Sequence, residues 1–274
     1  MVLPGPTEVF GYDFMVRALV AGLVVALVAA ILGVFNVLRG MALVSDGLAH
    51  VSLAGVAIGL VAGLYPLWAG LAAAILGGFA IQFLRERSLV KSDTAIGIVF
   101  SAGLAIGIAL ISRGGGLNVN VGNYLFGSIL AVTRADLLTV AIAGAVLIVA
   151  LVVFYKELLY LAFNEDAARV SGLPVTALNS AFTVLTAITV VLSARVVGVL
   201  LVSALMIVPA ASGLQLARSF RGALAISVLL GMVSVIVGLY ASFVYDVASG
   251  AAIALASTAV FLVSAGLRVV LART

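Results

Sequence analysis

The stretch "MVRALVAGLVVALVAAILGVFN", residues 15–36, carries one charged side chain, that of Arg17. A run of about 20 apolar residues is the length of helix that crosses the hydrocarbon core of a bilayer. Similar runs recur along the whole chain of 274 residues, of which 65% are hydrophobic and 9% charged, whereas water-soluble proteins are about a quarter charged. The sequence therefore predicts an all-α fold, a polytopic transmembrane helical bundle that forms one domain over residues 1–274.

The apolar runs predict nine membrane spans. Their expected limits are residues 15–36, 46–64, 66–84, 95–112, 137–154, 177–194, 198–217, 222–243 and 250–270. A count of eight or ten stays open, because residues 114–136 could dip into the membrane without crossing it.

The basic residues predict the orientation of these spans. With the N-terminus outside, ten of the 14 Lys and Arg residues fall in inside segments, and the other four fall outside. Cytoplasmic loops of membrane proteins carry such an excess of positive charge. We therefore expect a cytoplasmic C-terminus. The scattered basic residues are better explained by this topology than by binding of nucleic acid.

The chain contains no cysteine, so any metal ion must be held by oxygen and nitrogen ligands. The segment "MALVSDGLAHVSLAGVAIGL", residues 41–60, holds Asp46 and the only histidine, His50. Residues four apart share one face of a helix, so the two side chains can offer a carboxylate oxygen and an imidazole nitrogen to one metal ion. Alternatively, the pair caps or hydrogen-bonds the start of its helix. Because an ionisable pair is expensive to bury in a membrane, we favour the functional interpretation.

Glycine spacing indicates closely packed helices. Gly55, Gly59 and Gly63 form two overlapping G-x-x-x-G motifs, and Gly103 and Gly107 form another. We expect packing within the chain here, rather than a subunit interface.

The longest predicted inside loop is "KELLYLAFNEDAARVSGLPV", residues 156–175. Asn164 is a good N-cap, Glu165 and Asp166 suit the first turn of a helix, and Gly172 and Pro174 suit its stop. The loop is either a solvated connector or a helix that docks on a cytoplasmic protein. No G-x-x-x-x-G-K-[ST] phosphate loop occurs in the chain, so ATP is not bound by that route.

Several of these segments together resemble a known family. The stretches "MALVSDGLAHVSLAGVAIG", "KELLYLAFNEDAARVSGLPV" and "RVVGVLLVSALMIVPAASGLQLARSF" are similar to blocks of the manganese/zinc/iron permease family, the membrane subunits of ATP-binding-cassette metal importers. "KSDTAIGIVFSAGLAIGIALIS" and "YLFGSILAVTRADL" match further blocks in the same order. The resemblance covers about residues 15–270.

The resemblance implies a non-catalytic permease in the plasma (inner) membrane, without a permanently bound cofactor. Its partners would be a second permease copy, two cytoplasmic ATP-binding subunits, an extracytoplasmic metal-binding protein and the surrounding lipid. The cargo would be manganese, zinc or iron, with Asp46 and His50 as metal ligands in the pathway. The ATPase-coupling residues implied by the resemblance are Asn164, Glu165, Asp166, Arg169, Gly172 and Pro174.

Two other functions stay open. One is a related permease for a metal chelate, such as an iron complex or cobalamin. The other is a secondary metal carrier that works without an ATPase. Such carriers usually need several ionisable residues in mid-membrane, and this chain offers few.

Overall fold

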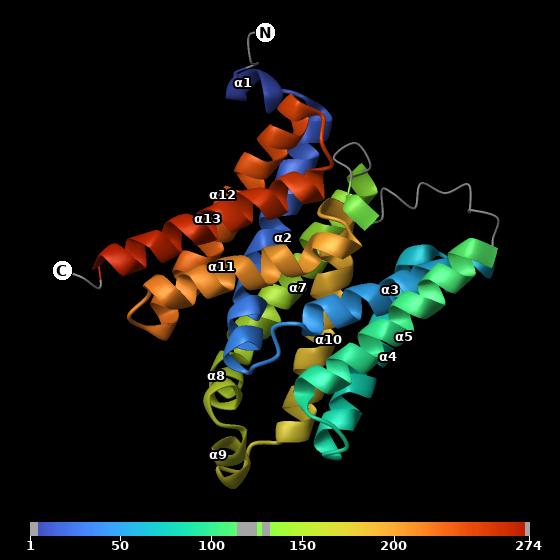
Figure 1. Ribbon diagram of the computed structural model, residues 1–274, viewed down its shortest axis with the longest axis vertical. Helices are drawn as coiled ribbons and strands as arrows, with labels where there is room; N and C mark the ends of the chain where they lie inside the picture. Colours follow the sequence, from blue (N-terminus) through green and yellow to red (C-terminus); the bar gives the residue numbers. More distant parts are fainter. Residues whose placement is uncertain (1–4, 114–124, 128–131, 272–274) are drawn as a thin grey trace. The chain divides into compact units, whose positions relative to one another are not determined.

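The computed structural model describes residues 5–113, 125–127 and 132–271, which are largely helical and contain no strand. The principal helices are α1 (Pro6–Val9), α2 (Asp13–Leu38), α3 (Val44–Val61), α4 (Pro66–Glu86), α5 (Ser92–Arg113), α7 (Arg134–Val153), α8 (Tyr155–Phe163), α9 (Glu165–Val170), α10 (Val175–Val196), α11 (Val202–Leu216), α12 (Phe220–Tyr245) and α13 (Ser249–Leu271), and the 3-10 turn η2 (Val199–Leu201) precedes α11 (Figure 1). The predicted helical membrane bundle is confirmed.

Eight helices in the described part of the chain are long and apolar enough to cross a membrane. They match eight of the nine predicted spans, with boundaries within a few residues. The run at 198–217 differs, because it is divided between η2 and α11, a helix of 15 residues that contains Pro209. Gly198 precedes η2 with a φ of 84°, a left-handed conformation that favours glycine. The alternative concerning residues 114–136 falls mostly outside the described residues.

Local sequence explains several helix ends. Pro66 occupies the first turn of α4, where its missing N–H removes no helical hydrogen bond. The Ser219 hydroxyl accepts a hydrogen bond from the Gly222 N–H at the start of α12. That helix ends at Asp246, which adopts a left-handed φ of 52°. These signals set the short turns on both sides of α12.

Contacts within the chain gather into two units. The first comprises the described residues of 1–37, 122–145 and 192–274, and it contains α11, α12 and α13 packed together. In this unit Tyr12 packs on Phe243 and Phe35 packs on Phe220, so α2 and α12 run antiparallel. The chain then returns along α12 as α13 (Figure 1). The prediction of a single domain stays a prediction.

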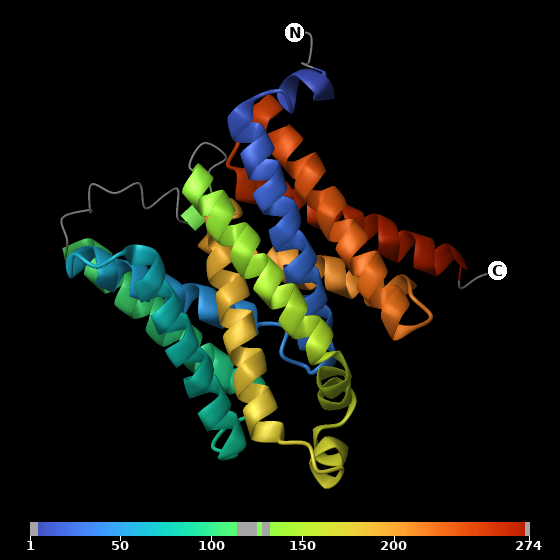
Figure 2. The ribbon, with the colours of Figure 1, turned by 180° about the vertical axis from the view of Figure 1, so that it is seen from behind.

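The second unit comprises the described residues of 38–121 and 146–191, and in it α3 packs against both α4 and α5 (Figure 2). Glycines make this close approach possible. A Cβ at Gly55 would lie 2.5 Å from the Ala69 carbonyl oxygen, and one at Gly103 would lie 2.8 Å from the Val51 Cα. The predicted packing role is confirmed for Gly55, Gly59 and Gly103, and their contacts fix the helix that carries Asp46 and His50. It is wrong for Gly63, which follows α3 with a left-handed φ of 68° and has no atom within 4 Å of a Cβ built there.

Candidate metal path and ATPase-coupling site

Asp46 and His50 both lie on α3, as predicted. Asp46 is half-buried in the first turn, and His50 is buried one turn later, with 7% of its surface exposed. The i, i+4 spacing directs both side chains to one face of the helix. The Asp–His pair is thus held on the helix that α4 and α5 enclose most closely.

The imidazole of His50 is oriented by aromatic packing. Its ring lies edge-on to that of Phe100 on α5, with 4.3 Å between centroids. His50 Nδ1 is buried and has no hydrogen-bond partner among the residues that the structure describes. A buried polar atom normally finds a partner, so this nitrogen retains its capacity to bind a ligand.

Asp46 does not cap α3. The N-cap residue is Leu43, which makes no side-chain capping bond. Among the described contacts Asp46 forms no ion pair, although its carboxylate is favoured by the helix dipole. The capping interpretation of the pair therefore has no support in this geometry.

The pair alone is an incomplete metal site. Within the part of the chain that the structure describes, no group of three or more His, Cys, Asp or Glu side chains lies close enough to hold an ion. A carboxylate and one imidazole nitrogen suit Mn²⁺, Fe²⁺ or Zn²⁺, which commonly take four to six ligands. Further ligands would be water, other oxygen atoms or side chains of another chain.

The predicted capped helix at residues 164–174 is confirmed. The Asn164 side chain accepts a hydrogen bond from the Ala167 N–H at 2.9 Å, and α9 starts at the next residue. Gly172 follows α9 with a φ of 82°, and Pro174 directly precedes α10. The sequence analysis treated residues 156–163 as part of this loop and did not predict α8, which follows α7 after a break at Phe154.

The side chains of α9 divide between two environments. Ala168 is buried and Glu165 is half-buried, whereas Asp166, Arg169 and Val170 are exposed. Val170 has 89% of its surface exposed, an unusual position for an apolar residue on a short polar helix. This outer face is available to a partner.

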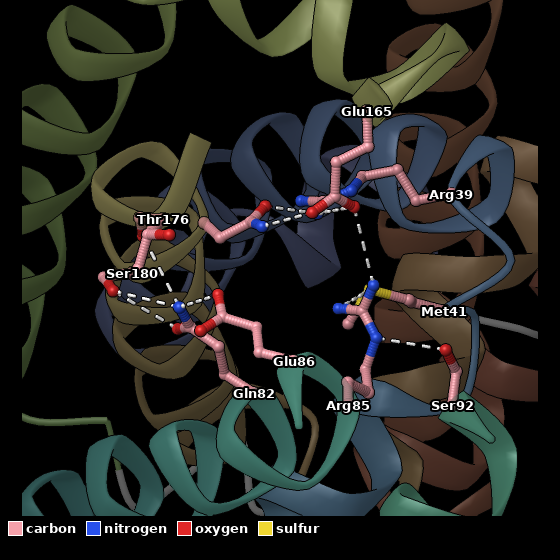
Figure 3. Close-up of polar contacts among 10 residues, drawn as sticks. Arg39, Met41, Gln82, Arg85, Glu86, Ser92, Glu165, Thr176 and Ser180 are labelled. Carbon is pink, nitrogen blue, oxygen red and sulfur yellow. Dashed lines mark hydrogen bonds and ion pairs between the residues drawn. The ribbon is translucent and has the colours of Figure 1, made fainter. Parts of the chain in front are cut away.

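Glu165 belongs to a charge cluster that the sequence analysis missed (Figure 3). Its Oε2 lies 3.9 Å from Nη2 of Arg39 and 3.7 Å from Nη2 of Arg85. Its Oε1 accepts a hydrogen bond of 2.8 Å from the Asn179 amide. The cluster joins α9 to α4, to α10 and to the connector between α2 and α3.

Among the three charged residues of this charge cluster, Arg39 is the most buried, with 5% of its side chain exposed. Its guanidinium carbon lies 4.9 Å from the centre of the Phe182 ring. Its Nη2 donates a 2.5 Å hydrogen bond to Oδ1 of Asn179. Burial, and secondly the positive charge of Arg85, lower the pKa of Arg39 to about 10, while Glu165 opposes this shift. Arg39 still carries a full charge near neutral pH, and the acceptors of Glu165 and Asn179 compensate it.

A pocket of about 1000 Å³ adjoins the charge cluster. It is lined by the α4–α5 connection, α9 and the first turns of α10. Gln82 lies near one side of it, donating hydrogen bonds to Glu86 and Ser180 (Figure 3). Gln82 and Asn179 are polar residues inside apolar runs, which is the sequence signal that would have indicated this polar region.

A protein-family model described as the ABC 3 transport family matches residues 11–268. The chain belongs to this family. It is 34% identical to the manganese transport system membrane protein MntC of Halalkalibacterium halodurans over 93% of this chain and 87% of that protein. It is 31% identical to the high-affinity zinc uptake system membrane protein ZnuB of Haemophilus influenzae, over 92% of this chain and 97% of that protein.

A solved structure is also similar to this ABC 3 transport family member. PsaBC from Streptococcus pneumoniae in complex with Fab contains a chain of 33% identity that superposes with a TM-score of 0.85. The match covers 94% of both chains. The resemblance to metal-importer permeases expected from the sequence is therefore confirmed, over almost the full length.

Proposed function

We propose that this protein is the permease subunit of an ATP-binding-cassette importer that moves divalent metal ions into the cytoplasm. The observation that carries the proposal is the match to the ABC 3 transport family over residues 11–268. The relatives of this chain are named for manganese and zinc, and a nitrogen of its buried His50 has no hydrogen-bond partner among the described residues. Manganese is the first candidate cargo because the relative MntC is named for it. Zinc follows from ZnuB, and iron from the similar ligand preference of Fe²⁺.

Asp46 and His50 bind the ion on its way through the membrane. Two ligands from one chain hold an ion weakly, and a transported ion must not be trapped. Two copies of this chain related by a two-fold axis would bring two carboxylates and two imidazoles to one ion. The metal site is therefore complete only in a homodimer in which α3 of both copies lies beside the ion.

ATP hydrolysis by two cytoplasmic ATPase subunits drives the transport, and the permease itself is non-catalytic. The ATPases dock on α9, whose exposed Asp166, Arg169 and Val170 offer charge and an apolar contact. Asn164, Gly172 and Pro174 define the limits of this helix. An extracytoplasmic metal-binding protein delivers the ion on the opposite side.

The proposed location is the plasma (inner) membrane, with the N-terminus outside and the C-terminus in the cytoplasm. The excess of basic residues in the predicted inside segments supports this orientation. The orientation places α9 and its charge cluster on the cytoplasmic side.

The experiment that tests the proposal is uptake of labelled manganese and zinc by metal-starved cells that express this chain with its cognate ATPase and binding protein. We expect ATP-dependent uptake by the native chain and loss of uptake in His50→Ala and Asp46→Asn. Asp93→Asn is the matched control, because Asp93 is an exposed acid in the first turn of α5. Absence of manganese, zinc and labelled Fe²⁺ uptake by the assembled native complex would refute the proposal and favour a chelate as cargo.

A further inference from the structure

The helix α9 has one set of side chains that is exposed to a partner and another that contacts the rest of the permease. Asp166, Arg169 and Val170 are exposed. The carboxylate of Glu165, in contrast, turns to two arginines and to Asn179 within its own unit. The carboxylate of Glu165 therefore bonds to residues of the permease itself rather than to an external partner.

Both arginines link Glu165 to the same segment, the connector of residues 39–43 that joins α2 to α3. Arg39 is the first residue of this connector. Arg85 reaches the connector by a second route, because its Nη1 donates a hydrogen bond of 3.1 Å to the sulfur of Met41 (Figure 3). Arg85 Nε also donates to the Ser92 hydroxyl at 3.0 Å, at the start of α5. The carboxylate thus contacts the connector directly and through Arg85.

The helix α3 begins at Val44, directly after this connector, and Asp46 lies in its first turn. A displacement of the connector therefore acts first on the N-terminal turn of α3, because the two segments are continuous in the chain. The rest of α3 is held tightly against α4 and α5. Motion that enters through the connector is concentrated at the end of α3 that carries Asp46 and His50.

We infer that Glu165 is a positioning residue for transport, which ties α9 to the α2–α3 connector and thereby conveys ATPase-driven movement of α9 to the Asp46–His50 pair. The inference rests on the proposed function for the identity of the partner and the cargo. Its structural basis is the pair of ion contacts made by one carboxylate. Networks of this kind can carry coupling between distant sites when both ends bias the same element.

Glu165→Gln is the appropriate change because it keeps the shape of the side chain and an oxygen that accepts from Asn179. It removes only the negative charge that Arg39 and Arg85 share. The matched control is again Asp93→Asn, an acid of the same unit that is exposed and outside the charge cluster. Thermal unfolding of both variants in detergent verifies that each one is folded.

The experiment uses the complete complex with its cognate ATPase and binding protein in lipid vesicles, and it measures ATP hydrolysis and manganese uptake together. We expect Glu165→Gln to retain bound ATPase and near-native ATP hydrolysis, while the manganese moved per ATP falls about tenfold. Arg85→Gln should show a smaller loss, because it leaves the contact of Glu165 with Arg39 in place. The double variant should be no worse than Glu165→Gln alone, because Glu165→Gln already removes both contacts. Glu165→Asp should restore part of the coupling.

A second readout is independent of the cargo. Hydrogen exchange of residues 39–47 is compared with and without ATP in the same complexes. We expect an ATP-dependent change in the native chain and in Asp93→Asn, but not in Glu165→Gln, whereas α9 itself responds in all three.

Three results would overturn the inference. The first is a native amount of manganese moved per ATP in Glu165→Gln. The second is loss of bound ATPase from that variant, which would make Glu165 a docking contact. The third is an ATP-dependent exchange of residues 39–47 in Glu165→Gln that equals that of the native chain. If the native complex transports neither manganese nor zinc, the proposed cargo fails, and hydrogen exchange alone decides the role of Glu165.

Discussion

The imidazole of His50 on α3 stands edge-on to the phenyl ring of Phe100 on α5, with an angle of 73° between the ring planes. This contact orients the imidazole without occupying Nδ1, which has no hydrogen-bond partner within the described part of the chain. Metal-binding histidines are usually oriented by a hydrogen bond from the second nitrogen to a neighbouring group. Here an aromatic edge contact contributes to the orientation.

Removal of the Phe100 ring should therefore weaken metal binding although both proposed ligands stay in place. We expect Phe100→Leu to raise the manganese concentration for half-maximal uptake about tenfold, in line with the loss of a group that orients a ligand. Phe79→Leu is the control, since Phe79 lies on α4 with 39% of its surface exposed. Equal half-saturation in the native chain and Phe100→Leu would exclude an orienting role.

The contact between α3 and α4 should tolerate no side chain at Gly55. A Cβ there would lie 2.5 Å from both the Ala69 oxygen and the Ala73 Cβ, so the helices would have to separate. Gly55→Ala should destabilise the fold by about 1–3 kcal/mol, as overpacking does. Gly97→Ala is a matched control, because no atom lies within 4 Å of a Cβ at that site. Thermal unfolding in detergent distinguishes them, and equal midpoints would contradict the packing argument.

The capping hydrogen bond of Asn164 should contribute measurably to the local stability of α9. Asn164→Ala removes the acceptor of the Ala167 N–H and should cost about 1 kcal/mol. The amides of residues 165–168 should then exchange faster with solvent water. Asn164→Asp retains an acceptor and should preserve protection. If Asn164→Ala exchanges at the native rate, the side-chain cap is not what maintains the helix.

The turn after α9 should depend on the backbone of Gly172 alone. Its φ is 82°, and no atom lies within 4 Å of a Cβ built there, so a substitution meets strain but no clash. Gly172→Val should cost about 1–2 kcal/mol and reduce co-purification of the ATPase subunits, whereas Gly172→Asn should be milder. Similar co-purification of both variants with the ATPase would show that this turn does not govern docking.

Much of the fold followed from patterns that act over a few residues. Apolar runs placed the spans, Asn164 and Gly172 predicted the limits of α9, and the spacing of Asp46 and His50 predicted a shared helix face. These predictions succeed because helix formation and capping depend on neighbours within one or two turns. The division of the apolar run at 198–217 between η2 and α11 was not predicted, since Gly198 acts within a stretch whose composition is otherwise uniform.

The sequence by itself determined that this protein is a helical membrane permease with an Asp–His pair and a capped loop helix. Only the tertiary structure decided that Glu165 meets Arg39 and Arg85, and that His50 rests against Phe100. The physical reason is that hydropathy specifies which segments enter the membrane, whereas the alignment of one helix with another depends on close packing of small residues. Side chains far apart in sequence become neighbours only after that packing has set the register of the helices.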